Sequence, residues 1–229
     1  MALFGPSRFF PPADWADPQG LVFIGGKLTP EWLLDAYRHA IFPWPLLPDF
    51  PQMLWWSPDP RAIFEFNDFY ISRRLARTVR SGKFQVTSDT AFVQVLRGCA
   101  SAQDREHETW LTEELQAAYY ELHRLGFAHS VEVWHEGQLA GGTYGVSVGG
   151  LFAAESMFHY VTDASKVALA VLIPHLKQRG YQLLDIQQLT DHTESLGAKE
   201  VSRQEYLRRL GGALRCPVKF GKIECKPHA

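Results

Sequence analysis

Two polar residues interrupt an apolar segment at positions 183–189. Asp185 and Gln187 lie two residues apart, with Leu184 and Ile186 beside them. On a strand, residues i and i+2 share a face about 6.5–7 Å apart, so the acid and the amide would lie side by side. Burying such groups is costly unless they are paired. Either they form a polar contact that holds a neighbouring loop, or they belong to a functional site.

A second strand-like segment, 151–158, carries a single acid among small and apolar residues. Glu155 shares one face with Ala153 and Met157. A carboxylate in these surroundings suits a pocket that holds an amine beside a hydrophobic group. The alternative is a salt bridge on a half-exposed strand.

A compact basic segment spans 71–83 and contains no acidic residue. The whole chain has a net charge of −2, so any contact with nucleic acid must use a local patch such as this one. On a helix, the first, third and fourth arginines of the segment would line one face and could bind phosphates. The alternative is a solvated helix face. The basic residues are Arg73, Arg74, Arg77, Arg80 and Lys83.

The tryptophans at positions 44 and 110 are candidate stacking residues. Trp44 is flanked by Pro43 and Pro45, and rigid indoles can stack on nucleobases. Taken alone, ordinary core packing is the favoured interpretation of Trp44 and Trp110.

Other apparent motifs are in the wrong context. Ser147 lies in a GxSxG pattern, but a second strand-like run follows, whereas a nucleophile elbow leads into a helix. Arg208, Gly211 and Ala213 match an acetyl-CoA pyrophosphate loop, yet they end a predicted helix. The nine histidines show no metal-ligand spacing, so we expect neither a metal nor a cofactor.

The elements predict an α+β fold. The chain has 229 residues, 46% of them hydrophobic. Residues 1–62, rich in Pro and Trp, predict a small irregular domain whose helix begins after Thr29. Residues 63–229 predict helices and strands around a central mixed sheet, in the element order of acetyltransferase-like folds. No segment suits membrane insertion or secretion, so we expect a cytoplasmic protein. The predicted helices are 71–80, 89–99, 112–125, 164–179 and 202–211, and the strands are 62–66, 84–87, 130–135, 138–148, 151–159 and 181–189.

A string of motifs in order resembles the leucyl/phenylalanyl-tRNA–protein transferase family over about residues 20–210. The resemblance implies that leucine or phenylalanine, and sometimes methionine, moves from aminoacyl-tRNA to proteins with N-terminal Arg or Lys, which creates an N-end-rule degradation signal. It also implies an acetyltransferase-like main domain and, as a family default, a monomer. The motifs lie at 20–29, 39–44, 54–61, 98–101, 109–110, 128–134, 141–145, 155–158, 164–166 and 191–198.

The same resemblance implies residue roles. Asp185 and Gln187 would relay a proton from the attacking amine, and Glu155 would lie near the α-amine of the donor. The arginine helix would meet the acceptor stem of the tRNA. The residues expected to hold the terminal adenosine are Trp44 and Trp110, with Tyr37 and Tyr119 nearby.

The donor side-chain pocket departs from the expected pattern, in which a methionine and large aromatics line it. Here Thr143, Leu172 and Leu176 occupy the matching positions, with Ser156 and Met157 beside them. The preference for leucine or phenylalanine therefore does not carry over.

Three other functions compete with aminoacyl transfer. They are, in order, an acetyl-CoA N-acetyltransferase, a non-catalytic RNA-binding module and a serine hydrolase acting through Ser147.

Overall fold

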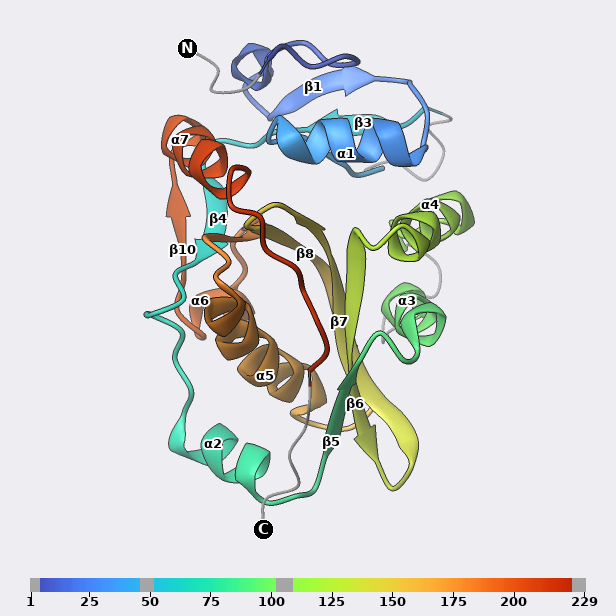
Figure 1. Cartoon of the computed structure of the whole chain (residues 1–229), viewed down its shortest axis with the longest axis vertical. Coiled ribbons are helices and arrows are strands. Elements are labelled where there is room, and N and C mark those ends of the chain that lie inside the picture. The colour runs from blue at the N-terminus through green and yellow to red at the C-terminus, as the bar shows by residue number, and fades with distance from the viewer. Residues whose placement is uncertain (1–4, 46–51, 102–108, 224–229) are drawn as a thin grey trace.

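A seven-stranded mixed sheet forms the centre of the molecule (Figure 1). The computed structural model describes residues 5–45, 52–101 and 109–223. Neighbouring strands pair antiparallel except β8 and β9, which are parallel. The predicted α+β fold with a central mixed sheet is confirmed. The sheet order is β10 (Ala198–Val201), β4 (Arg61–Phe64), β9 (Leu183–Gln187), β8 (Leu151–His159), β7 (Gln138–Val148), β6 (Ala128–His135) and β5 (Gln85–Ser88).

The central meander β6–β7–β8 follows the predicted turns. Glu136 and Gly137 join β6 to β7 with positive φ angles of 52° and 76°, a backbone conformation that suits a tight hairpin. Gly149 and Gly150 join β7 to β8. The two hairpins place β6, β7 and β8 side by side, and the chain then passes through α5 to β9.

Helices cover both faces of this sheet (Figure 1). On one face, α5 (Ala164–Arg179) packs on Val131 and Val133 of β6. On the other face, α3 (Phe92–Ser101) and α4 (Glu113–Arg124) pack on Tyr144 and Val146 of β7. Each face of the sheet therefore has its own hydrophobic core. Successive residues of a strand point alternately into one core and the other, as expected for a sheet that is buried on both faces. The short helix α2 (Arg73–Arg80) contacts α5.

The described residues before position 60 add a small three-stranded sheet and the helix α1 (Pro30–Arg38). Pro30 opens α1, as predicted, although Thr29 makes no side-chain cap hydrogen bond. Tyr37 and Ile41 belong to the same hydrophobic core as residues of α4 and β7. This part therefore packs directly on the main sheet. Its elements are a 3₁₀ turn, Ala13–Trp15, with β1 (Leu21–Ile24), β2 (Phe42–Pro43) and β3 (Leu54–Trp56).

Several elements differ from prediction. The strand expected over 181–189 is shorter, because β9 spans Leu183–Gln187. The short helix α6 (Asp191–Glu194) and strand β10 were not predicted, since four residues give too few periods for a pattern. The final helix α7 spans Arg203–Ala213, with Ser202 as its N-cap. No helix within the described ranges is long and apolar enough to cross a membrane.

Candidate active site

A pocket of about 670 Å³ lies beside the two parallel strands. β8 and β9 pair only from Leu151 to Ala153 on β8, although both strands continue beyond that point. Residues past the last pair line the pocket, so the pocket opens where the strands part. Its lining also comes from the 42–44 segment, Trp110, α5 and α6. The two strands contribute Ala154, Glu155, Ser156, Met157, His159, Ile186 and Gln187.

Asp185 is fully buried behind the pocket, and both of its carboxylate oxygens are occupied. Arg61 Nε donates to Oδ1 at 2.9 Å, and Arg61 Nη2 donates to Oδ2 at 2.6 Å. The Tyr206 hydroxyl donates to Oδ2 at 2.8 Å, and the backbone N–H of Gln187 donates to Oδ1 at 2.9 Å. Asp185 is 0% exposed and does not line the pocket. Its geometry fits a residue that positions Gln187 rather than one that meets a substrate.

Gln187 is held in an unusual conformation at the end of β9. Its φ of 60° lies in the left-handed region, which is uncommon for a residue other than glycine. Such a backbone persists only when its surroundings fix it, and the bond to Asp185 does so here. The side-chain Nε2 donates to Glu155 Oε1 at 3.1 Å. That assignment leaves Gln187 Oε1 as the acceptor available to a substrate.

Sequence analysis missed Arg61, which is 1% exposed. Its guanidinium lies 4.6 Å from the ring centroids of both Phe42 and Tyr206, and Nη1 donates to the carbonyl of Ala40 at 3.1 Å. Burial acts against the charge, but Asp185 and Tyr206 outweigh it and hold the pKa of Arg61 above its usual value. The sequence carried two signals for Arg61: it ends the family-like motif at 54–61, and it is a lone basic residue at the start of an apolar strand.

Two acids line the pocket, and Glu155 is the one that a strand contributes. Burial raises its pKa to about 7, although hydrogen bonds from tyrosine hydroxyls oppose the shift. Tyr119 donates to Glu155 Oε2 at 2.9 Å, and the hydroxyls of Tyr37 and Tyr119 lie 3.0 Å apart. Near pH 7 this carboxyl therefore exists in both protonation states.

Tyr37 and Tyr119 lie behind Glu155. Both are buried, 2% and 0% exposed, and neither lines the pocket. The two tyrosines were expected near the adenosine, and the structure places their hydroxyls against each other and against the Glu155 carboxylate. Trp44 and Trp110 do line the pocket, with Phe42. These partly buried indoles leave faces on which a base can stack.

The residues expected around the donor side chain separate into two groups. Thr143, Ser156 and Met157 line the pocket. Leu172 and Leu176 are 0% exposed, lie in the core between α5 and the sheet, and do not line it. Only the first turns of α5 reach the pocket, where Ser165 and Leu169 line it. Sequence matching overlooked Leu169, which lies one turn before Leu172.

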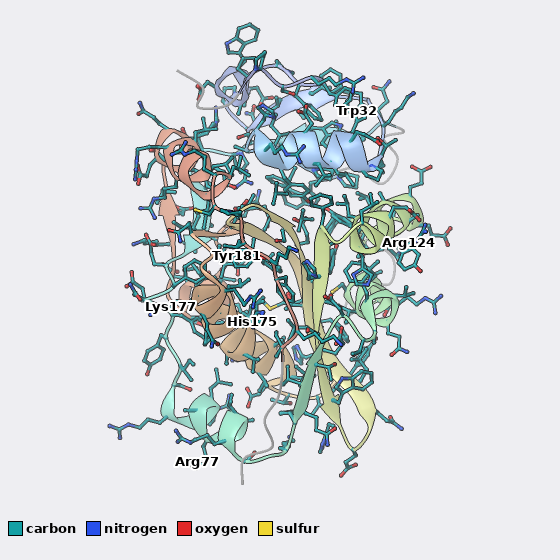
Figure 2. All side chains as sticks on the ribbon, viewed as in Figure 1. Trp32, Arg77, Arg124, His175, Lys177 and Tyr181 are labelled. Carbon is teal, nitrogen blue, oxygen red and sulfur yellow. The ribbon has the colours of Figure 1, made fainter. Side chains whose placement is uncertain are left out.

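The arginine helix is real but begins later than predicted. Ser72 caps α2 by accepting a hydrogen bond from the N–H of Leu75. Arg74 Nη2 pairs with Asp163 Oδ1 at 2.8 Å, and both residues line the pocket. Arg77 projects outward from α2 (Figure 2). Exposed basic side chains for which the described residues supply no carboxylate partner are Arg73, Arg77, Arg80 and Lys83.

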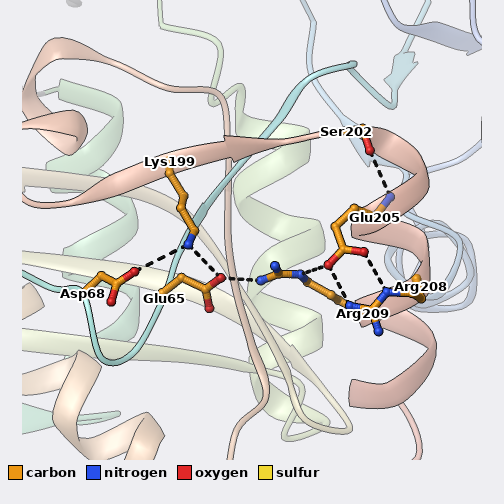
Figure 3. Close-up of polar contacts among 7 residues, drawn as sticks. All are labelled: Glu65, Asp68, Lys199, Ser202, Glu205, Arg208 and Arg209. Atoms are coloured by element: carbon orange, nitrogen blue, oxygen red, sulfur yellow. Dashed lines mark hydrogen bonds and ion pairs between the residues drawn. The ribbon is translucent and has the colours of Figure 1, made fainter.

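A network of surface ion pairs links α7 to the edge of the sheet at β4 and β10 (Figure 3). Arg209 joins Glu205 of its own helix, at 2.7 Å, to Glu65, at 2.5 Å. Lys199 of β10 then joins Glu65 at 3.1 Å. Tyr206 leaves the inner face of the same helix to reach Asp185. The network therefore helps to position the tyrosine that supports Asp185.

The other motifs remain outside this site. Ser147 lies in β7, its strand is followed by β8, and its Oγ lies 2.6 Å from the Tyr181 hydroxyl. Gly211 and Ala213 end α7, as predicted. Within the described part of the chain, no group of three or more His, Cys, Asp or Glu side chains is arranged to hold a metal ion.

Comparison with known proteins places these residues in context. The family model described as leucyl/phenylalanyl-tRNA protein transferase matches residues 63–211, and its N-terminal domain model matches residues 26–59. A leucyl/phenylalanyl-tRNA–protein transferase of Syntrophotalea carbinolica is 50% identical over 89% of this chain and 88% of its own. The relative from Pseudomonas entomophila is 49% identical over 92% and 93%. A solved aminoglycoside acetyltransferase from an uncultured soil sample is 13% identical, with a TM-score of 0.36, over 50% of this chain and 85% of its own.

Proposed function

This chain belongs to the leucyl/phenylalanyl-tRNA protein transferase family, and on that premise we propose that its pocket transfers an aminoacyl group from aminoacyl-tRNA to the α-amine of a protein. One observation carries the proposal most directly. The buried Arg61–Asp185 pair fixes Gln187, whose amide points at Glu155 inside a pocket with an aromatic lining. That arrangement suits an ester and two amines better than it suits a hydrolytic nucleophile.

The donor end of the tRNA fits the pocket in parts. The terminal adenine stacks on Trp44 and Trp110, whose faces are available. The α-amine of the aminoacyl group lies near Glu155, which hydrogen-bonds it in the ionised form. The side chain of the donor amino acid lies against Met157 and Leu169, both of which line the pocket. Thr143 donates its hydroxyl to the carbonyl of Ser156 at 2.8 Å, so it presents its methyl group there.

The reaction needs no external activation, because the donor is already an ester. The acceptor amine attacks the ester carbonyl, the bond to the ribose oxygen breaks, and the proton lost by the amine ends on that oxygen. An α-amine with a pKa of about 7.7–8.0 is roughly 10–20% neutral at pH 7, so a strong base is unnecessary. Gln187 Oε1 accepts a hydrogen bond from the attacking amine and orients it.

For Asp185 we propose a role other than the proton relay that the family resemblance implies. It has four hydrogen bonds and no exposed surface, so it has no route to an amine in the pocket. We assign it to positioning: it fixes the backbone of Gln187, and Arg61 and Tyr206 fix Asp185.

The finer details remain proposals. We propose leucine, phenylalanine and, as an occasional donor, methionine, with proteins that begin in Arg or Lys as acceptors. The product would be an N-end-rule degradation signal. We propose that the protein acts as a monomer in the cytoplasm.

A direct transfer assay tests the function. Radiolabelled leucyl-tRNA and phenylalanyl-tRNA are supplied separately, with a peptide beginning in Arg or with its N-acetylated twin. Label should enter only the peptide with a free amine, and the ratio of donors reports the shape of the side-chain pocket. Labelled acetyl-CoA provides a parallel reaction for the rival acetyltransferase. Transfer from acetyl-CoA without transfer from either tRNA would contradict the proposal.

A further inference from the structure

Three basic side chains from three separate elements line the same pocket. His159 ends β8, Lys166 lies in the first turn of α5, and His192 belongs to α6. The proposed roles in aminoacyl transfer use none of them. Their positions are separated by up to 33 residues in the sequence, so the fold brings them together at the pocket.

These three side chains have no carboxylate partner among the described residues. Of the acids that line the pocket, Glu155 is held by Tyr119 and Gln187, and Asp163 is paired with Arg74 at 2.8 Å. The nearest polar contact of His159 is Ser165 Oγ, 3.5 Å from Nδ1. Lys166 has no hydrogen-bond or ion-pair partner in the part of the chain that the structure describes. Lys166 therefore brings to the pocket a positive charge that has no carboxylate partner among the described residues, and two imidazoles that can donate hydrogen bonds line the same pocket.

The three side chains line one pocket, and the charges of Lys166 and His159 act on His192 there. Burial lowers the pKa of His192, and the positive charges of Lys166 and His159 lower it further. The first turn of α5 adds to the same field, since Asp163 makes no side-chain cap hydrogen bond to it. Side chains that repel one another in the free protein are stabilised when an anion binds between them.

We propose that His159, Lys166 and His192 form a phosphate subsite for the donor RNA. Resting on the proposed function, its ligand is the phosphodiester on the 5′ side of the terminal adenosine. That group is the first negative charge encountered from the aminoacylated end, so it must lie next to a pocket that holds the adenosine. Apart from Arg74, the exposed arginines of α2 do not line the pocket, so they suit phosphates farther along the RNA.

Two small donor analogues isolate this phosphate from the rest of the tRNA. Both contain 3′-amino-3′-deoxyadenosine with leucine in a stable amide linkage. One carries a free 5′-hydroxyl and the other a singly charged 5′-methyl phosphate. Titration calorimetry at low salt should give about tenfold tighter binding of the phosphate analogue, the size expected for charge-assisted hydrogen bonds in a partly solvated site.

Variants of one helix then assign the effect to the subsite. Lys166→Met should reduce the preference severalfold and leave the affinity for the 5′-hydroxyl analogue unchanged, whereas Lys166→Arg should restore it. Lys177→Met is the matched control, because Lys177 projects from the far end of the same helix (Figure 2). His192→Gln should reduce the preference as Lys166→Met does.

Each other outcome contradicts a definite part of the proposal. Equal affinity of the wild-type protein for the two analogues overturns the phosphate subsite and leaves the donor pocket intact. Failure of both analogues to bind overturns the donor pocket and the subsite together. An equal effect of Lys177→Met shows general electrostatic attraction and overturns the subsite. So does a Lys166→Met variant that keeps the phosphate preference and raises only the KM for the acceptor peptide.

Discussion

Replacing Asp185 by Asn tests whether the buried pair with Arg61 supports the site. The two side chains are 0% and 1% exposed and meet through two hydrogen bonds of 2.6 and 2.9 Å. Asp185→Asn keeps an oxygen for the backbone N–H of Gln187, but it leaves the Arg61 charge without a counter-ion. Breaking a buried pair in this way costs about 3–5 kcal/mol, a large part of a typical unfolding free energy of about 5–15 kcal/mol.

Urea denaturation followed by fluorescence measures this loss. With a slope of about 3 kcal/mol per M for a chain of this size, the midpoint should fall by about 1–2 M. Arg61→Met should cause a loss of similar size, because it leaves the Asp185 carboxylate without its main donors. The double variant should be less destabilised than the sum of the two single variants, since it removes both charges.

Transfer assays on the same proteins separate folding from positioning. Below the unfolding transition, Asp185→Asn should lower kcat while the affinity for aminoacyl-tRNA changes little, because Asp185 does not line the pocket. Strictly additive losses of stability in the double variant would refute the buried-pair argument. Parallel losses of kcat and tRNA affinity would refute the positioning role.

Three further predictions follow from the site and its surroundings. The Glu155 carboxyl has a pKa of about 7 in the folded protein and near 4.5 in the unfolded chain. Between pH 4.5 and 7 the folded protein therefore binds a proton that the unfolded chain has lost, and the free energy of unfolding falls as the pH rises through this range. Glu155→Gln should therefore raise the free energy of unfolding at pH 8 by up to about 3 kcal/mol and change it little at pH 4, measured by urea titration at each pH. Met157→Ala should change the ratio of leucine to phenylalanine transfer, whereas Leu172→Ala should leave that ratio unchanged and lower stability by about 2–5 kcal/mol; the opposite pattern would place Leu172 in the pocket. Alanine at the exposed α2 residues Arg73, Arg77 and Arg80 should weaken tRNA binding and flatten its dependence on salt, with Arg124→Ala of α4 as the control. An unchanged salt dependence would mean that these arginines are only a solvated surface.

The acidic and amide residues of the site could be predicted because strand alternation is a local signal. Asp185 and Gln187 interrupt an apolar run, and Glu155 does the same in another. Their position next to a pocket follows from how two parallel strands separate, which no local pattern records. Family resemblance supplied the link between the two segments, and the structure then showed that the amide and Glu155 are in contact at 3.1 Å.

The supporting residues could not be predicted because their partners are distant in sequence. Arg61 lies 124 residues before Asp185, and Tyr206 lies 21 residues after it on a separate helix. Leu172 and Leu176 were expected to line the donor side-chain pocket, and they lie outside its lining for another reason. Helical spacing places them near the face that holds Leu169, but the pocket reaches only the first turns of α5. The distance along a helix at which a pocket closes depends on tertiary packing.

The chain of contacts from Ala40 through Arg61 and Asp185 to Tyr206 has a consequence for biosynthesis. The N-terminus of a growing chain leaves the ribosome first. Arg61 therefore emerges long before Asp185, and Tyr206 emerges later still. Until then the early aromatic residues have no fixed place beside Gln187, and the guanidinium remains hydrated. A growing chain therefore lacks the geometry to bind a reactive ester productively. The contacts around Asp185 are complete only once α7 has docked, which links the geometry of Gln187 to the synthesis of that helix.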